Sequence, residues 1–164
     1  MDSESKKVSN ILEAIAASNE ELIKFAIKLR ALSEVDEVYH RLDCRNYQTG
    51  PVLEMYVDAF HQSEVGICWW LEVRWNEAEW IIDSSVQLNH DEGQDSIRDF
   101  PLRTARTIEE FIVQLEGATL DLLSCTDLIE LLESWAGCPG QAQSRRHRAL
   151  DMAPAGTSLQ GMNR

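Results

Sequence analysis

Carboxylates and aromatic rings alternate along a tryptophan-rich hairpin in this chain, and they are the side chains best suited to chemistry. Side chains alternate along the strand that opens this hairpin, 65–75, and this alternation puts Trp70 and Glu72 on the same side. A tight turn pairs Trp75 with Trp80, which brings Glu72 opposite Asp83. Facing carboxylates can serve as general acid and base, whereas acids beside aromatic rings can hold a basic partner.

The preceding expected strand, 52–61, adds residues to the same side of the sheet. Its alternation places Glu54, Tyr56 and Asp58 there. The register carries a two-residue uncertainty, so that either Glu54 or Tyr56 lies beside Trp70. The candidate partner-binding residues are Trp70, Tyr56, Glu54, Asp58, Glu72 and Asp83. In the alternative interpretation, a C-terminal helix covers the aromatic part of this side and the carboxylates lie in water at its rim.

The residue spacing does not indicate catalysis or metal binding. Paired carboxylates would need a cleft and a raised pKa to catalyse a reaction, and the sequence indicates neither. His40 alternates onto the core side of its strand, where we expect a hydrogen-bonded histidine. The four cysteines are too widely spaced for a zinc site or a disulfide framework. The segment 89–95 lacks the ligand pattern of a calcium loop. We therefore expect no enzyme, no catalytic residue, no metal site and no cofactor.

Charge narrows the class of partner. The chain of 164 residues has a formal charge of −13. Four arginines against one aspartate give 137–164 a charge of +3, which leaves 11 basic and 27 acidic residues, or −16, for the rest. Such a body repels nucleic acid and anionic membranes and attracts a basic protein. The alternative interpretation is that the acidity serves only to keep the protein soluble. The sequence has no leader-like or membrane-spanning apolar run, so we expect a cytoplasmic protein that binds neither nucleic acid nor membrane.

The spacing of apolar residues predicts the helices and strands that position these side chains. Apolar spacing predicts a first helix near 8–15, and a capping-box pattern beginning at Ser18 predicts the start of a second. Period-two alternation then predicts four strands, with 89–95 as a polar loop and 96–100 as a fifth, edge strand. Another capping box at Thr107 opens a C-terminal helix, and a short helix follows near Thr126.

These elements predict an α+β fold: an antiparallel four- to five-stranded meander sheet with two N-terminal and two C-terminal helices packed on it. Residues 1–136 form a single domain in this interpretation. Residues 137–164 are rich in Gly, Pro, Ala, Ser and Gln and contain a run of arginines, which predicts a disordered basic tail.

Several segments together resemble small bacterial immunity proteins of polymorphic-toxin systems. They are Trp69-Trp70-Leu71-Glu72-Val73, Trp80-Ile81-Ile82-Asp83-Ser84-Ser85-Val86, Gly93-Gln94-Asp95, and Phe100-Pro101-Leu102-Arg103-Thr104-Ala105 before an acidic capped helix. The likeness spans roughly 35–123. It implies an acidic, cytosolic α+β protein that binds and blocks one cognate toxin, often a basic nuclease. The basic C-terminal segment departs from that pattern.

Two other classes of function remain open at this point. The aromatic side of the sheet can bury itself against a second copy, giving a homodimer, or it can hold a small ligand in an apolar pocket. Raising the salt concentration distinguishes the homodimer from the toxin complex, because salt weakens a complex with a basic toxin and strengthens an acidic homodimer.

Overall fold

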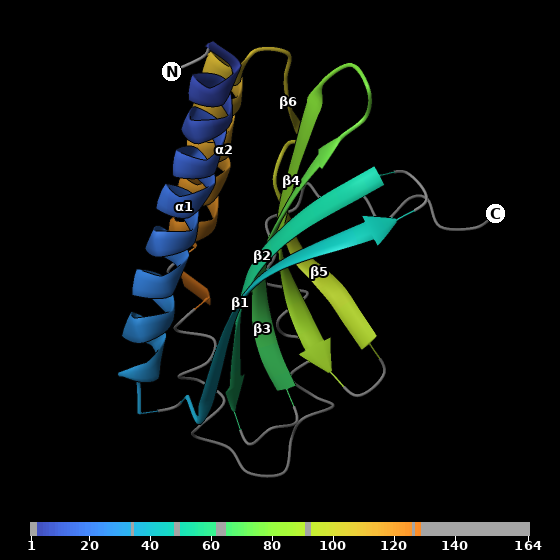
Figure 1. The fold of residues 1–164 in the computed structure, drawn as a ribbon. Helices are drawn as coiled ribbons and strands as arrows, with labels where there is room; N and C mark the ends of the chain where they lie inside the picture. Colours follow the sequence, from blue (N-terminus) through green and yellow to red (C-terminus); the bar gives the residue numbers. More distant parts are fainter. Residues whose placement is uncertain are drawn as a thin grey trace, which may run out of the picture.

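The described part of the chain forms two helices and one antiparallel sheet (Figure 1). The computed structural model describes residues 3–33, 35–47, 50–61, 65–90, 93–125 and 127–128. The elements are α1 (Ser3–Arg30), β1 (Glu37–Tyr47), β2 (Gly50–His61), β3 (Val65–Trp75), β4 (Trp80–His90), β5 (Gly93–Asp99), β6 (Arg103–Ala105) and α2 (Ile108–Leu123). Strands β1 to β5 lie side by side in chain order, and β6 pairs with β4. This arrangement confirms the predicted α+β class and the antiparallel meander.

The first helix corrects the prediction of two N-terminal helices. α1 runs unbroken for 28 residues, and Ser18 lies buried within it. Core-facing residues recur through the expected break at intervals of four and three, at Ile11, Ile15, Ser18, Leu22 and Phe25. Because that stripe continues and no Gly or Pro interrupts it, Ser18 occupies a packing position and does not cap a helix. No helix in the described ranges is long and apolar enough to cross a membrane.

Both helices cover the same face of the sheet. α1 contacts β1 and β2, α2 contacts β3, β4 and β6, and the two helices contact each other. Beneath α1, the Trp69 ring is fully buried and packs edge-on against Phe25, with ring centroids 5.0 Å apart. His40 of β1 lies half-buried against α1, where its Nε2 is 2.9 Å from Oδ1 of Asn19. The prediction of a hydrogen-bonded histidine on this side is therefore confirmed.

The tryptophan-rich hairpin has the predicted register. Trp75 lies opposite Trp80, with ring centroids 5.0 Å apart. In the turn, Oδ1 of Asn76 accepts a hydrogen bond from the backbone N–H of Glu79 at 3.0 Å, and Glu77 adopts φ of 74°. Trp75 is 38% exposed, so it packs at the end of the sheet and not in the core where alternation predicts it.

The far side of the sheet contains more strand than the sequence predicts. β4 continues to His90 and β5 begins at Gly93, so five of the seven residues of the expected loop 89–95 belong to strands, and 91–92 lie outside the described residues. β6 was not predicted. β5 forms an edge of the sheet, and its polar residue Gln94 is exposed to solvent.

The C-terminal elements confirm one prediction and leave another outside the described residues. The backbone N–H of Glu110 donates to Oγ1 of Thr107 at 3.1 Å, and Oε2 of Glu110 accepts from the backbone N–H of Thr107 at 3.2 Å, so the capping box opens α2 as predicted. The described part thus has one N-terminal and one C-terminal helix. The short helix predicted near Thr126, apart from Asp127 and Leu128, and the predicted tail 137–164 lie outside it.

Replacing Trp69 tests the core. Trp69→Ala removes a fully buried ring, and we expect it to lower the free energy of unfolding by about 3 to 5 kcal/mol. Trp69→Phe should cost clearly less, because it leaves a smaller cavity and removes an indole Nε1 that has no hydrogen-bond partner. Denaturant unfolding followed by circular dichroism measures both values. Equal losses for the two variants would contradict this account of the core.

Candidate functional site

The face of the sheet opposite the helices is the candidate site, and we call it the open face. No described helix packs on it, as Figure 1 shows. Alternation from the buried residues Val57, Trp69 and Val86 assigns the side chains to this face. From β2, β3 and β4 they are Val52, Glu54, Tyr56, Asp58, Phe60, Gly66, Cys68, Trp70, Glu72, Arg74, Ile81, Asp83, Ser85, Gln87 and Asn89.

Four carboxylates cross the open face in one line, which we call the acidic row. Asp43 pairs with Glu54, Glu54 with Glu72, and Glu72 with Asp83, on four successive strands. Neighbouring strands lie about 4.8 Å apart, so each acid stands beside the next. Sequence reasoning found three members of this row but missed Asp43. The register of β1 against β2, once known, would have identified it.

Two arginines partly neutralise the acidic row. Nε of Arg45 lies 3.1 Å from Oε2 of Glu54 and 3.3 Å from Oδ2 of Asp43. Nη1 of Arg74 lies 3.2 Å from Oε1 of Glu72. Both arginines are exposed at the side of the row, whereas Glu54 is only 9% exposed. Four carboxylates against two guanidinium groups leave the row with a negative balance.

The acids in the middle of the row are poorly solvated. Burial raises the pKa of Glu72, and the charges of Glu54 and Asp83 raise it further, against the opposing effect of Arg74. Burial also raises the pKa of Asp83, assisted by the charge of Asp99 and opposed by a backbone hydrogen bond and by Arg74. Each ionised carboxylate therefore costs energy in the isolated protein, and a further cation placed on the row would reduce that cost.

An aromatic pair lies directly beside the acidic row. Tyr56 faces Trp70 in the register of β2 with β3, which settles the two-residue uncertainty in favour of Tyr56. Both rings are half-buried, with Arg41 of β1 and Ser85 of β4 completing their line across the sheet. Tyrosine and tryptophan combine a large apolar area with a polar tip, which is the composition found at the centre of protein interfaces.

Asp58 lies one line further from the acidic row and is tied into the sheet. Its Oδ1 accepts a hydrogen bond from Nδ2 of Asn89 at 3.0 Å, and it faces Cys68 across the strand pair. Burial raises the pKa of Asp58, while hydrogen bonds from Cys68 and Asn89 oppose that shift. The structure thus brings together five of the six candidate residues and places Asp58 beside them in a hydrogen-bond network of its own.

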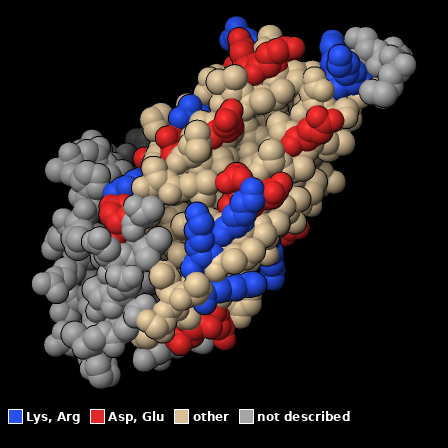
Figure 2. Space-filling model, turned by 90° about the vertical axis from the view of Figure 1, so that its left-hand side faces the viewer, with Lys and Arg blue, Asp and Glu red and all other residues tan. Residues whose placement is uncertain are grey.

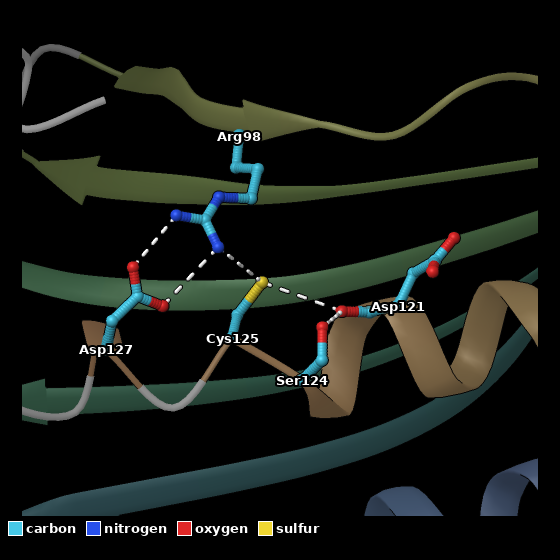
Figure 3. Close-up of polar contacts among 5 residues, drawn as sticks. All are labelled: Arg98, Asp121, Ser124, Cys125 and Asp127. Carbon is cyan, nitrogen blue, oxygen red and sulfur yellow. Dashed lines mark hydrogen bonds and ion pairs between the residues drawn. The ribbon is translucent and has the colours of Figure 1, made fainter. Parts of the chain in front are cut away.

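A second polar cluster lies on the helix side, where Arg98 of β5 meets the end of α2 (Figure 3). Nη2 of Arg98 is 2.9 Å from Oδ2 of Asp127, and its Nη1 donates to Sγ of Cys125 at 3.3 Å. Burial raises the pKa of the Cys125 thiol despite the nearby guanidinium, which disfavours a reactive thiolate. These contacts connect the sheet to the chain after α2, and we assign them a structural role.

Among the residues that the structure describes, the other charged groups form no comparable row. Figure 2 shows the helix-bearing side, where basic and acidic groups are interspersed over a largely uncharged surface. Among the described residues, no three His, Cys, Asp or Glu side chains are placed to hold a metal ion. The acidic row is spread over four strands, so its carboxylates face a partner surface and do not converge on one atom.

Comparison with protein-family models, curated proteins and solved structures gives no match for this chain.

The raised pKa of Asp83 makes a prediction about stability. When a carboxyl group has a higher pKa in the folded than in the unfolded protein, the free energy of unfolding falls as the pH rises from the lower pKa to the higher one. We expect Asp83→Asn to increase the free energy of unfolding at pH 7 by a few tenths to about 1 kcal/mol. The gain should shrink as the pH falls and vanish below about pH 3, where Asp83 is protonated in both the folded and the unfolded protein. Urea unfolding across this pH range measures it.

Glu116→Gln is the matched control, since it removes one negative charge from the exposed surface of α2. We expect it to change stability by less than about 0.5 kcal/mol at every pH. A loss of stability in Asp83→Asn at pH 7 would contradict the conclusion that burial makes the ionised Asp83 carboxylate costly.

Proposed function

We propose that this protein is a non-catalytic binding protein that captures a basic protein through its open face. We further propose that it is a bacterial immunity protein, acting in the cytoplasm, and that its partner is a cognate toxin such as a nuclease. The observation that carries the proposal is the acidic row beside the Tyr56–Trp70 pair, on a face where no described helix packs.

Electrostatics favours a basic partner over any other class. The row has more carboxylates than arginines, and residues 1–136 carry a charge of −16. A nuclease needs positive charge to hold phosphates, so a protein with the opposite field can approach its binding surface rapidly and cover it. Complementary charge of this kind increases the association rate most strongly at low ionic strength.

The state of the carboxylates adds a thermodynamic argument. Burial raises the pKa of Glu72 and Asp83, which means that water stabilises their charges poorly. A lysine or arginine of the partner would supply the missing stabilisation and lower both pKa values on binding. The cost stored in the free protein thus favours a complex with a cation-bearing surface.

The aromatic pair supplies the apolar part of the proposed interface. Trp70 and Tyr56 lie at the centre of the face, with the acidic row on one side and the line of Asp58 and Cys68 on the other. Large rings surrounded by polar groups match the arrangement in which a few central residues provide most of the binding energy. We assign Trp70 and Tyr56 as anchors and Glu72 and Asp83 as the acids that meet the partner's cations.

Capture with surface variants tests this proposal. The immobilised protein, incubated with lysate of its source organism at low salt, should retain a basic protein that elutes as salt increases. For the captured protein, we expect Trp70→Ala to weaken binding by roughly 30-fold or more, as removal of a central anchor does. The double variant Glu72→Lys with Asp83→Lys should abolish binding. Calorimetric titration of the purified pair measures the affinities.

The double variant Glu109→Lys with Glu116→Lys is the control, because it makes the same change of charge on exposed residues of α2. It should retain most of the affinity, since only long-range attraction is reduced. Full retention by both open-face variants would reject the open face as the site. Retention of no basic protein, or of a small ligand bound around Trp70, would reject the proposed function.

A further inference from the structure

Strand β1 leaves a long, regular edge of the sheet unpaired in the described part of the chain. It pairs only with β2, over the whole of Glu37–Tyr47 and without a bulge. The strand at the other end, β5, is shorter and carries a register shift against β4 at Val86. Bulges and short strands protect an edge from pairing with another chain, whereas a long straight strand invites it.

The hydrogen-bonding groups that this edge presents follow from the register. The backbone N–H of Asn76 donates to the carbonyl of Glu79 at 3.2 Å, which fixes the alternation in β3 and, through unbroken registers, in β2 and β1. Even-numbered residues of β1, Leu42 among them, therefore point their N–H and C=O groups outward. Arg30 of α1 supports this assignment independently, since its Nη2 donates to the carbonyl of Val38 at 3.0 Å.

Exposed apolar side chains gather along this edge. In the described part of the chain, seven of the eleven exposed large apolar side chains lie on α1 and β1. On β1 they are Tyr39, Leu42 and Tyr47, and on α1 they are Val8, Leu12, Ile23 and Ile27.

The apolar residues of α1 lie on the flank of the helix that is turned toward the β1 edge. Asn19 and Arg30 mark that flank, because both contact β1. Ile23 and Ile27 fall between them at helical intervals of four and three residues, so they share the same flank. Val8 and Leu12 continue it toward the start of the helix.

We propose that a second copy of this chain pairs with β1 edge to edge, antiparallel, about a two-fold axis at Leu42. The sheets of the two copies then form one continuous sheet, and the apolar flanks of the two α1 helices face each other across the axis. This interface is separate from the open face, so it does not rest on the proposed function.

Charge selects this register from the alternatives. Centring the pair on Leu42 places Arg41 opposite Asp43 of the second copy, twice by symmetry, and Tyr39 opposite Arg45 of the second copy. Centring it on Arg41 or on Asp43 would set like charges directly opposite each other, which is unfavourable. Centring it two residues to either side of Leu42 would leave part of each strand unpaired.

Two groups of the Leu42 register already have a partner within the single chain: Asp43 lies 3.3 Å from Nε of Arg45, and the carbonyl of Val38 accepts from Arg30. Both can accept a second hydrogen bond, because a carboxylate and a carbonyl each have more than one lone pair.

Leu42 is 47% exposed and would contact Leu42 of the second copy, with Cα atoms about 5.5 Å apart. Arg41 is exposed, and its charge acts on Asp58 of the same chain, which leaves its side chain free to turn toward Asp43 of the second copy. The acidic row of each chain would then end against an arginine of the other.

Charge exchange across the axis tests the proposal. The full chain should sediment as a dimer at micromolar concentration. Arg41→Asp and Asp43→Arg should each sediment as a monomer, because each sets like charges opposite each other. An equimolar mixture of the two variants should recover the dimer mass, since every pair across the axis is then complementary. This recovery also shows that both variants are folded.

Cross-linking tests the position of the axis. In a background of Cys44→Ser and Cys138→Ser, Leu42→Cys places two thiols at the axis, where a short bis-maleimide should join them. Tyr47→Cys is the control, because its two copies lie ten positions apart in register, or roughly 30 Å, and should not be joined. Trp70→Ala should leave the dimer mass unchanged.

Three outcomes would overturn the inference. They are a monomeric full chain, dimers that persist in both single charge variants, and a mixture of variants that stays monomeric. Failure to capture a basic partner affects only the proposed function, since the dimer is measured on the purified chain alone.

Discussion

The burial of Trp69 beneath α1 is the constraint on which the rest of the sheet depends. A β-strand turns successive side chains to opposite faces, so fixing one residue against a helix fixes the face of every other residue in that strand. The ring of Trp69 is fully buried against Phe25, and its neighbours across the strands, Val57 and Val86, are buried with it. A slip of one residue in any of these strands would place carboxylates under the helices. The acidic row is thus the reverse side of the hydrophobic core.

The sequence predicted the parts of the fold that depend on local rules. The Trp75–Trp80 hairpin and the Thr107 capping box require only neighbouring residues, and both are confirmed. Ser18 shows where a local rule fails. Its capping pattern is genuine in sequence, but a continuous apolar stripe on both sides lets the helix run through it, because packing against the sheet outweighs the preference of one residue.

In the candidate site, too, only the features that depend on neighbouring residues were predictable. Glu72 and Asp83 face each other across a short turn, so their pairing followed from the hairpin. Tyr56 and Glu54 could not be told apart as neighbours of Trp70, since the segment that joins β2 and β3 does not define a register by itself. Asp43 was missed because its place in the acidic row depends on three strand registers together, those of β1 with β2, β2 with β3 and β3 with β4. β6 escaped detection because a three-residue strand has no usable period.

The open face and the β1 edge differ in their balance of charge. A chain with a net charge of −13 repels its own copies at a distance, so self-association requires local complementarity of the kind that Arg41 and Asp43 provide at the edge. The open face has no such balance, because its two arginines leave part of the acidic row unneutralised. Added salt screens both long-range fields. It therefore favours pairing of two acidic chains and opposes capture of a basic one, which gives the two surfaces separable behaviour. In a dimer joined at β1, the two open faces lie on the same side of one sheet, so the surface offered to a partner doubles without any change in the site itself.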